Sequence, residues 1–177
     1  MNIFILDENP ILAAQMHCDQ HLHKMILESA QMVSTAFHLN ALDKLPIGSI
    51  PEVYRPAYVN HPCTKWTCES LENILWVCQL GLELENIRIR SGYQPHKSAA
   101  ILWGVYKLIF SNGSYNYNNH TPFVTAMPLT IAIRTCSVVQ KYQTYYRYKY
   151  AEWLDSGRRM TYKHNPTPSF MSDLITD

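Results

Sequence analysis

The sequence predicts an all-α fold: a single compact helical domain with about four main helices and long loops. Apolar residues recur at three- and four-residue spacing in several long stretches, and no run of alternating apolar and polar residues indicates a sheet. With 177 residues and 47% hydrophobic content, the chain can form one domain with its own core. We therefore expect one domain over residues 1–177, with residues 155–177 as an extended basic and aromatic tail.

The first helix is predicted to begin near Pro10, behind a cap at Asp7 or Asn9, and to continue to about Leu39. Residues 43–58 hold three prolines and a glycine, which predicts a surface loop. Residues 129–133 are ambiguous between helix and strand. Later helices are predicted where an apolar pattern follows a capping residue or proline and ends near a glycine, at residues 63–90, 96–110 and 137–154. For the tryptophans at positions 76 and 103, core packing is the preferred interpretation.

The first predicted helix carries a narrow polar stripe on an otherwise apolar surface. At 100° per residue, five polar side chains fall within about 60° of one another: His17, His21, Lys24, Glu28 and Thr35. A narrow row of titratable groups between hydrophobic residues is typical of a helix that lines a site, so His17 is a candidate substrate-binding residue. The structural alternatives are an i,i+4 ion pair of Lys24 with Glu28, and a helical metal pair of His17 with His21 for which no third ligand is identifiable.

Three loop motifs each join a rigid proline to polar or aromatic side chains. Loops held at the surface by a scaffold carry function disproportionately, whereas each motif taken singly is better explained as a cap or turn. The candidate substrate-binding residues from these motifs are Asn60, His61, Trp66, Glu69, His96, Lys97, Thr121 and Phe123.

Charge is distributed unevenly along the chain. Residues 1–90 hold six Lys/Arg and ten Asp/Glu, a net charge of −4, whereas residues 91–177 hold nine and four, a net charge of +5. The basic, aromatic second half is compatible with a phosphate-bearing partner, and a solvated helix face explains it equally well.

Cysteine usage and hydropathy indicate a cytoplasmic protein. The five cysteines show no C-x-x-C pair, so we expect reduced thiols, no zinc site and no cofactor. No apolar run is long enough to span a membrane, and acids stand near the start where a secretory signal would carry positive charge.

The motif Asp19-Gln20-His21-Leu22, with Glu28 seven residues after His21, resembles the first helix of the phage pyrimidine-dimer DNA glycosylases of the endonuclease V type. Tyr145-Tyr146-Arg147-Tyr148 is similar to the tyrosine-rich, DNA-contacting tail of that family, which adds Tyr145 and Arg147 to the binding candidates. The whole chain resembles a group of small tailed-phage proteins with the patterns HCD-H--KMI-E-AQ, NHP---W and TPF--AMP, which implies a location in the host cytoplasm.

The glycosylase resemblance implies that an N-terminal α-amine attacks the sugar C1′ while a glutamate handles charge and protons. Glu28 matches that glutamate. The family exposes its amine by removing the initiator methionine, whereas Asn2 is expected to leave Met1 in place, and Met25, Ile26 and Leu27 stand where the family has arginine. Two mechanisms remain: Lys24, desolvated beside His21, supplies the amine, or Glu28 positions water at the anomeric carbon. The catalytic candidates are thus Glu28, Lys24 and His21.

The predicted partner is DNA or a nucleotide. A base unstacked into the pocket would stack on one of four aromatic residues, with Asn60 at its edge. The leading hypothesis is an enzyme acting at an N-glycosidic or modified-pyrimidine centre. The alternatives are a transferase or accessory factor in phage DNA base hypermodification, and a non-catalytic nucleotide-binding protein that sequesters a defence signal. The candidate stacking residues are Trp66, Phe123, Tyr115 and Tyr117.

Overall fold

The computed structural model describes residues 1–41, 52–113 and 116–175, and every regular element in these ranges is helical, which confirms the predicted all-α class. Most of the predicted loop at 43–58, as well as Tyr115, lies outside the described residues. None of the described helices is long and apolar enough to cross a membrane. The α-helices are α1 (Pro10–Gln15), α2 (Asp19–Ala36), α3 (Pro62–Thr67), α4 (Leu71–Arg90), α5 (Lys97–Ser111), α6 (Leu129–Ala132) and α7 (Val138–Asp155).

Two of the predicted helices are each divided in two, so the prediction of an unbroken helix from residue 10 to 39 is wrong. Cys18 is extended between α1 and α2, and its N–H bonds to the Tyr146 hydroxyl at 3.0 Å. The N–H of Asp19 donates to the Thr161 carbonyl at 2.8 Å. The first turn of α2 is therefore capped by distant parts of the chain, which local periodicity does not reveal.

The second division separates α3 from α4, because the Ser70 side chain caps a new helix by accepting the N–H of Asn73 at 3.1 Å. The predicted fourth helix is confirmed as α7, which begins with a capping box formed by Ser137 and Gln140. The ambiguous segment at 129–133 forms the short helix α6.

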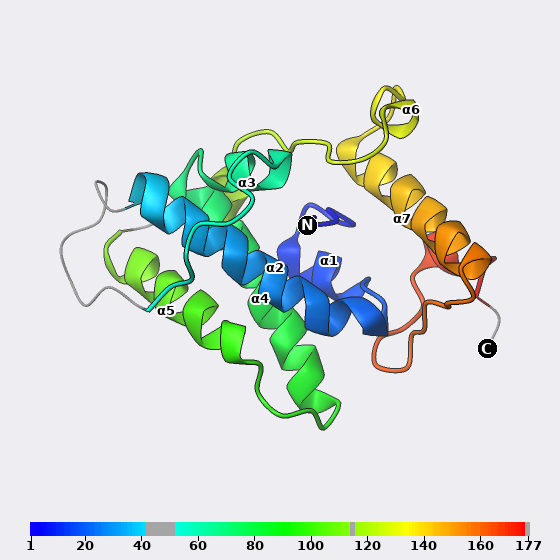
Figure 1. The fold of residues 1–177 in the computed structure, drawn as a ribbon, viewed down its shortest axis with the longest axis horizontal. Helices are drawn as coiled ribbons and strands as arrows, with labels where there is room; N and C mark the ends of the chain where they lie inside the picture. The colour runs from blue at the N-terminus through cyan, green and yellow to red at the C-terminus, as the bar shows by residue number, and fades with distance from the viewer. Residues whose placement is uncertain (42–51, 114–115, 176–177) are drawn as a thin grey trace.

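Helices α1 to α5 pack into a layered body, and α7 stands on the other side of the N-terminal arm, residues 1–6 (Figure 1). Trp76 is fully buried in this body, as predicted, whereas Trp103 on α5 is 53% exposed, so its assignment to the core is wrong. The N-terminal arm contributes Ile3, Phe4 and Ile5 to the core. The arm thus joins the two parts of the fold.

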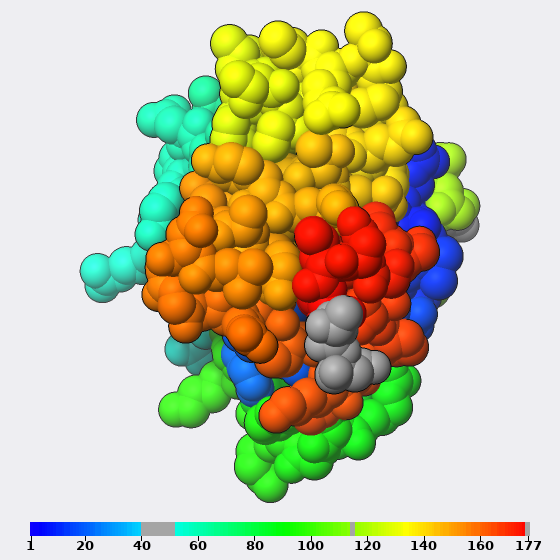
Figure 2. Space-filling view, turned by 90° about the vertical axis from the view of Figure 1, so that its right-hand side faces the viewer, coloured from blue at the N-terminus to red at the C-terminus, as the bar shows by residue number. Residues whose placement is uncertain are grey.

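The C-terminal residues pack along α7 and form one face of the molecule with it (Figure 2). The segment from 158 to 164 is fastened to the start of α2 by Asp19. The carboxylate of Asp19 accepts the Thr161 hydroxyl at 2.6 Å and the N–H groups of Lys163 and His164 at 2.9 and 3.2 Å. These bonds hold the segment in place, and a short 3-10 helix at Ser169–Met171 follows it.

Candidate functional site

A cavity of about 290 Å³ opens between α2, the N-terminal arm and α7. All three predicted catalytic residues, His21, Lys24 and Glu28, line it, and so does the predicted binding residue Tyr145. The other lining residues come from the arm, from α7 and from the segment that follows α7: Met1, Asn2, Phe4, Lys149, Trp153 and Arg158.

The Glu28 carboxylate lies between two amines. Its Oε2 accepts the Asn2 N–H at 2.8 Å and lies 3.7 Å from the amino nitrogen of Met1, while Oε1 lies 3.6 Å from Nζ of Lys24. Glu28 is buried, but the Lys24 side chain is 63% exposed. The desolvation that would make Lys24 a nucleophile is therefore not present, which corrects that expectation. The better shielded amine is that of Met1.

Tight turns hold the amino end of the chain against Glu28. The Asn2 side chain accepts the N–H of Phe4 at 2.9 Å and donates to the Ala126 carbonyl at 2.7 Å. Phe4 has a φ of 38°, which costs a non-glycine residue on the order of 1–2 kcal/mol. The hydroxyl of buried Thr64 donates to the sulfur of Met1 at 3.4 Å. These contacts fix the position of the Met1 amine, although the backbone at Phe4 is strained.

His21 lines the cavity and lies in a buried hydrogen-bond network. Its Nδ1 lies 2.7 Å from the Tyr146 hydroxyl, which also accepts the N–H of Cys18 at 3.0 Å. Burial, followed by the positive charges of His17, Lys24 and Lys149, holds the pKa of His21 well below its usual value. The Phe4 ring stacks on the imidazole with 4.9 Å between centroids.

His17 does not belong to the cavity, which corrects its assignment as a substrate-binding residue. The break between α1 and α2 turns it into the core, where it is fully buried and its Nδ1 donates to the Ala13 carbonyl at 2.7 Å. Its Nε2 has no hydrogen-bond partner among the residues that the structure describes. Burial lowers the pKa of His17 to about 4.

This burial predicts that the protein loses stability in mild acid. Because the pKa of His17 in the folded state lies below the usual 6.5, the stabilisation is complete above pH 6.5 and is lost as pH falls toward 4. We expect a loss of about 3 kcal/mol from His17, with His21 acting in the same direction. Urea unfolding between pH 4 and 7 measures it. His17→Asn keeps a donor for Ala13 without titrating, so an equally steep decline in this variant would contradict the assignment.

Four of the predicted loop residues are joined by contacts with one another and do not line the cavity: Trp66, Glu69, Thr121 and Phe123. Trp66 is fully buried, donates to the Thr121 carbonyl at 3.3 Å and packs on Phe123 at 5.2 Å between ring centroids. The Thr121 hydroxyl donates to Glu69 at 2.6 Å. These contacts join α3 to the segment at 120–123, and Tyr117 packs partly buried against the core. The expected role of Trp66 as a base-stacking residue is corrected because no face of its ring is open.

The other predicted binding residues lie at helix ends or in separate contacts. The imidazoles of His61 and His96 cap α3 and α5, and Asn60 is exposed in the turn ahead of α3. Lys97 borders a separate cleft beside Tyr54. Arg147 forms a two-pronged ion pair with Asp173. The pKa of His61 is lowered first by burial and then by the charge of the Met1 amine, while the charge of Glu28 raises it.

Sequence reasoning missed three side chains that α7 and the following segment bring to the cavity. Lys149 and Trp153 follow Tyr145 at four-residue spacing, which places all three on one stripe of a helix. Arg158 lies over the ring of Trp153, with its guanidinium carbon 5.4 Å from the ring centroid. The sequence alone predicts that Tyr145, Lys149 and Trp153 share one face of a helix. It does not reveal that this face lines the same cavity as α2.

The cavity combines one carboxylate with several positive groups. The Met1 amine, Lys24, Lys149 and Arg158 line it together with Glu28, while Lys149 also pairs with Glu152 at its edge. Such a site can bind an anion and move a proton at Glu28. Within residues 1–41, 52–113 and 116–175, no group of three or more His, Cys, Asp and Glu side chains is placed to hold a metal ion. In comparisons with known proteins, no family model, no curated protein and no solved structure matches this chain.

Proposed function

We propose that the protein acts at the N-glycosidic centre of a DNA or nucleotide substrate, with Glu28 as the key carboxylate. The distance of 3.7 Å between Glu28 Oε2 and the Met1 amino nitrogen carries this proposal. The glycosylase-like spacing of His21 and Glu28 implies a carboxylate next to an amine, and Glu28 and the Met1 amine form such a pair. The amine here belongs to Met1 itself, so no removal of the methionine is required.

In the proposed reaction, the neutral Met1 amine attacks C1′ and the bond from C1′ to the base breaks. The amine loses a proton, with Glu28 as its acceptor, and the base leaves with a proton. Opening of the sugar ring then gives an imine between Met1 and C1′, and O4′ takes up a proton.

The walls of the cavity suit the rest of such a substrate. Tyr145 and Trp153 offer aromatic surface for a base, and the His21 imidazole packs against Trp153 with 5.4 Å between ring centroids. Lys149 and Arg158 supply positive charge for a phosphate. These features support a ligand that combines a ring with an anionic group.

Borohydride trapping on an oligonucleotide with one abasic site tests this proposal. The abasic sugar presents a C1′ aldehyde whatever the natural base is, so the probe does not require the true substrate. We expect a covalent adduct that tandem mass spectrometry places on the Met1 amine, and Lys24→Arg should keep it. An adduct at Lys24 would move the nucleophile there. The absence of any adduct would contradict an amine nucleophile at this site.

The positive charge around the cavity also supports a second candidate, a nucleotide-binding protein without turnover. Three basic side chains face a space of about 290 Å³, which suits a small phosphorylated ligand as well as an extruded nucleotide. Recovery of an intact nucleotide after incubation, together with a negative trapping result, would favour this candidate.

A further inference from the structure

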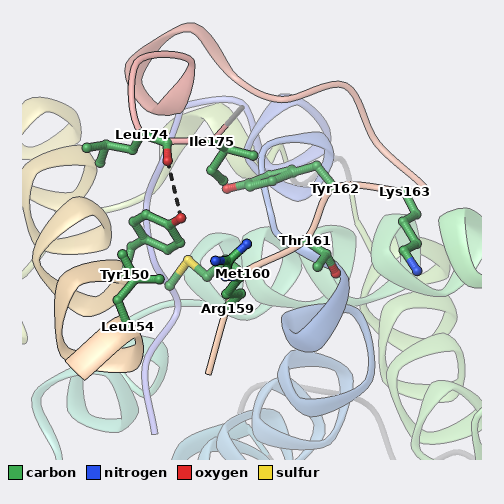
Figure 3. Close-up of a pocket in the computed structure, with 9 residues that line it drawn as sticks. All are labelled: Tyr150, Leu154, Arg159, Met160, Thr161, Tyr162, Lys163, Leu174 and Ile175. Atoms are coloured by element: carbon green, nitrogen blue, oxygen red, sulfur yellow. Dashed lines mark hydrogen bonds between the residues drawn. The ribbon is translucent and has the colours of Figure 1, made fainter. Parts of the chain in front are cut away.

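We infer that a second cavity, next to the first, is a binding site for a nucleoside phosphate group. This cavity measures about 480 Å³ and lies between the end of α7, the segment at 159–163 and the C-terminal residues (Figure 3). The choice of a nucleotide as ligand rests on the proposed function, but the cavity shares no lining residue with the site around Glu28.

Two tyrosines and several apolar side chains form part of the walls of the second cavity. Tyr150 lies on one side and Tyr162 on the other, and Met160 lies between them (Figure 3). The Tyr150 hydroxyl donates to the Leu174 carbonyl at 3.2 Å, which holds the C-terminal residues over the cavity. Aromatic side chains of this kind stack on a base of any sequence.

Positively charged side chains also line this cavity. The guanidinium group of Arg159 points into the cavity between the two tyrosines (Figure 3). Lys163 and Thr161 also line it. Whereas Arg147 is bound to Asp173, Arg159 makes no hydrogen bond or ion pair within the part of the chain that the structure describes. A guanidinium without a partner beside aromatic walls is suited to a phosphate oxygen attached to a base-bearing sugar.

The two cavities are connected by one fixed piece of backbone. Arg158 lines the Glu28 cavity and the next residue, Arg159, lines the second one. Asp19 and Gln20 at the start of α2 hold this segment through Thr161. Because adjacent residues of one segment line the two cavities, we expect a ligand with two nucleotide units to reach both. The phosphate group is the same whether it belongs to a free nucleotide or to the adjoining unit of a strand.

Binding measurements on the full chain test this site and separate the two sources. The probes are thymidine 5′-monophosphate and a single-stranded thymidine tetranucleotide, titrated calorimetrically into wild type, Arg159→Gln and Arg134→Gln. Arg134 is exposed next to α6 and provides the matched control for loss of charge. We expect Arg159→Gln to weaken binding about tenfold or more, and Arg134→Gln to have little effect.

Weakening with the tetranucleotide alone would assign the cavity to the adjoining unit of a strand, and weakening with both probes to a free nucleotide. Equal effects of the two variants, or no binding by wild type, would overturn the inference. Glu28→Gln distinguishes this inference from the proposed function, because it should leave the Arg159-dependent binding in place. Binding that depends on Arg159 with no trapped adduct would reject the proposed function alone, and an adduct with no such dependence would reject the second site alone.

Discussion

Glu28→Gln is expected to slow formation of the borohydride-trapped adduct by about 10²–10⁴-fold. The amide keeps the shape of the carboxylate and can still accept the Asn2 N–H, which is now 2.8 Å from Oε2. It cannot take the proton that the Met1 amine gives up, nor balance the positive charge that develops on the sugar. The first-order rate of adduct formation with enzyme in excess measures this effect.

The same substitution at Glu152 is the matched control. Glu152 pairs with Lys149 at 2.6 Å at the edge of the cavity but does not line it. Glu152→Gln should therefore keep a rate within a few-fold of wild type, and both variants should show the thermal unfolding of a folded protein. Equal rates for Glu28→Gln and wild type would exclude Glu28 from the chemistry.

Glu85→Ala is expected to lower the free energy of unfolding by about 3–5 kcal/mol. Both side chains of the Glu85 and Arg88 pair are buried, with 2.9 Å between the charged atoms. The other Glu85 oxygen accepts the N–H of His96 at 2.7 Å. Removing the carboxylate leaves a buried guanidinium with His23 as its remaining acceptor, and a neutral imidazole cannot balance the charge.

Glu83→Ala provides the comparison on the same helix. Its partner Arg90 is 65% exposed, so we expect a loss of less than about 1 kcal/mol. For a chain of this length, the loss at Glu85 corresponds to a fall in Tm of roughly 6–20 °C. Differential scanning calorimetry on both variants measures this, and similar Tm values would contradict the role of the buried pair.

Much of the fold follows from local sequence signals. The helix starts were predicted correctly from Asn9, Ser137 and the prolines near them, because a cap acts on residues within one turn. The divisions inside two predicted helices were missed. Cys18 is held extended by Tyr146, which lies 128 positions away, and periodicity carries no information about such a contact.

The candidate site was partly predictable for the same reason. His21, Lys24 and Glu28 lie within two helical turns of one another, so their common face could be read from spacing. The Met1 amine could not, because its position depends on Asn2 reaching Ala126 across the fold. Among the proline motifs, the imidazoles of His61 and His96 serve as caps, which accounts for polar residues beside proline without any ligand.

The contact of the N-terminal arm with α7 also sets the order in which the site can be assembled during synthesis. Met1 and Glu28 leave the ribosome early, but Tyr145, Lys149 and Arg158 complete the cavity only when most of the chain has been made. Closing so long a loop is entropically costly, so the cavity should be among the last parts of the molecule to form.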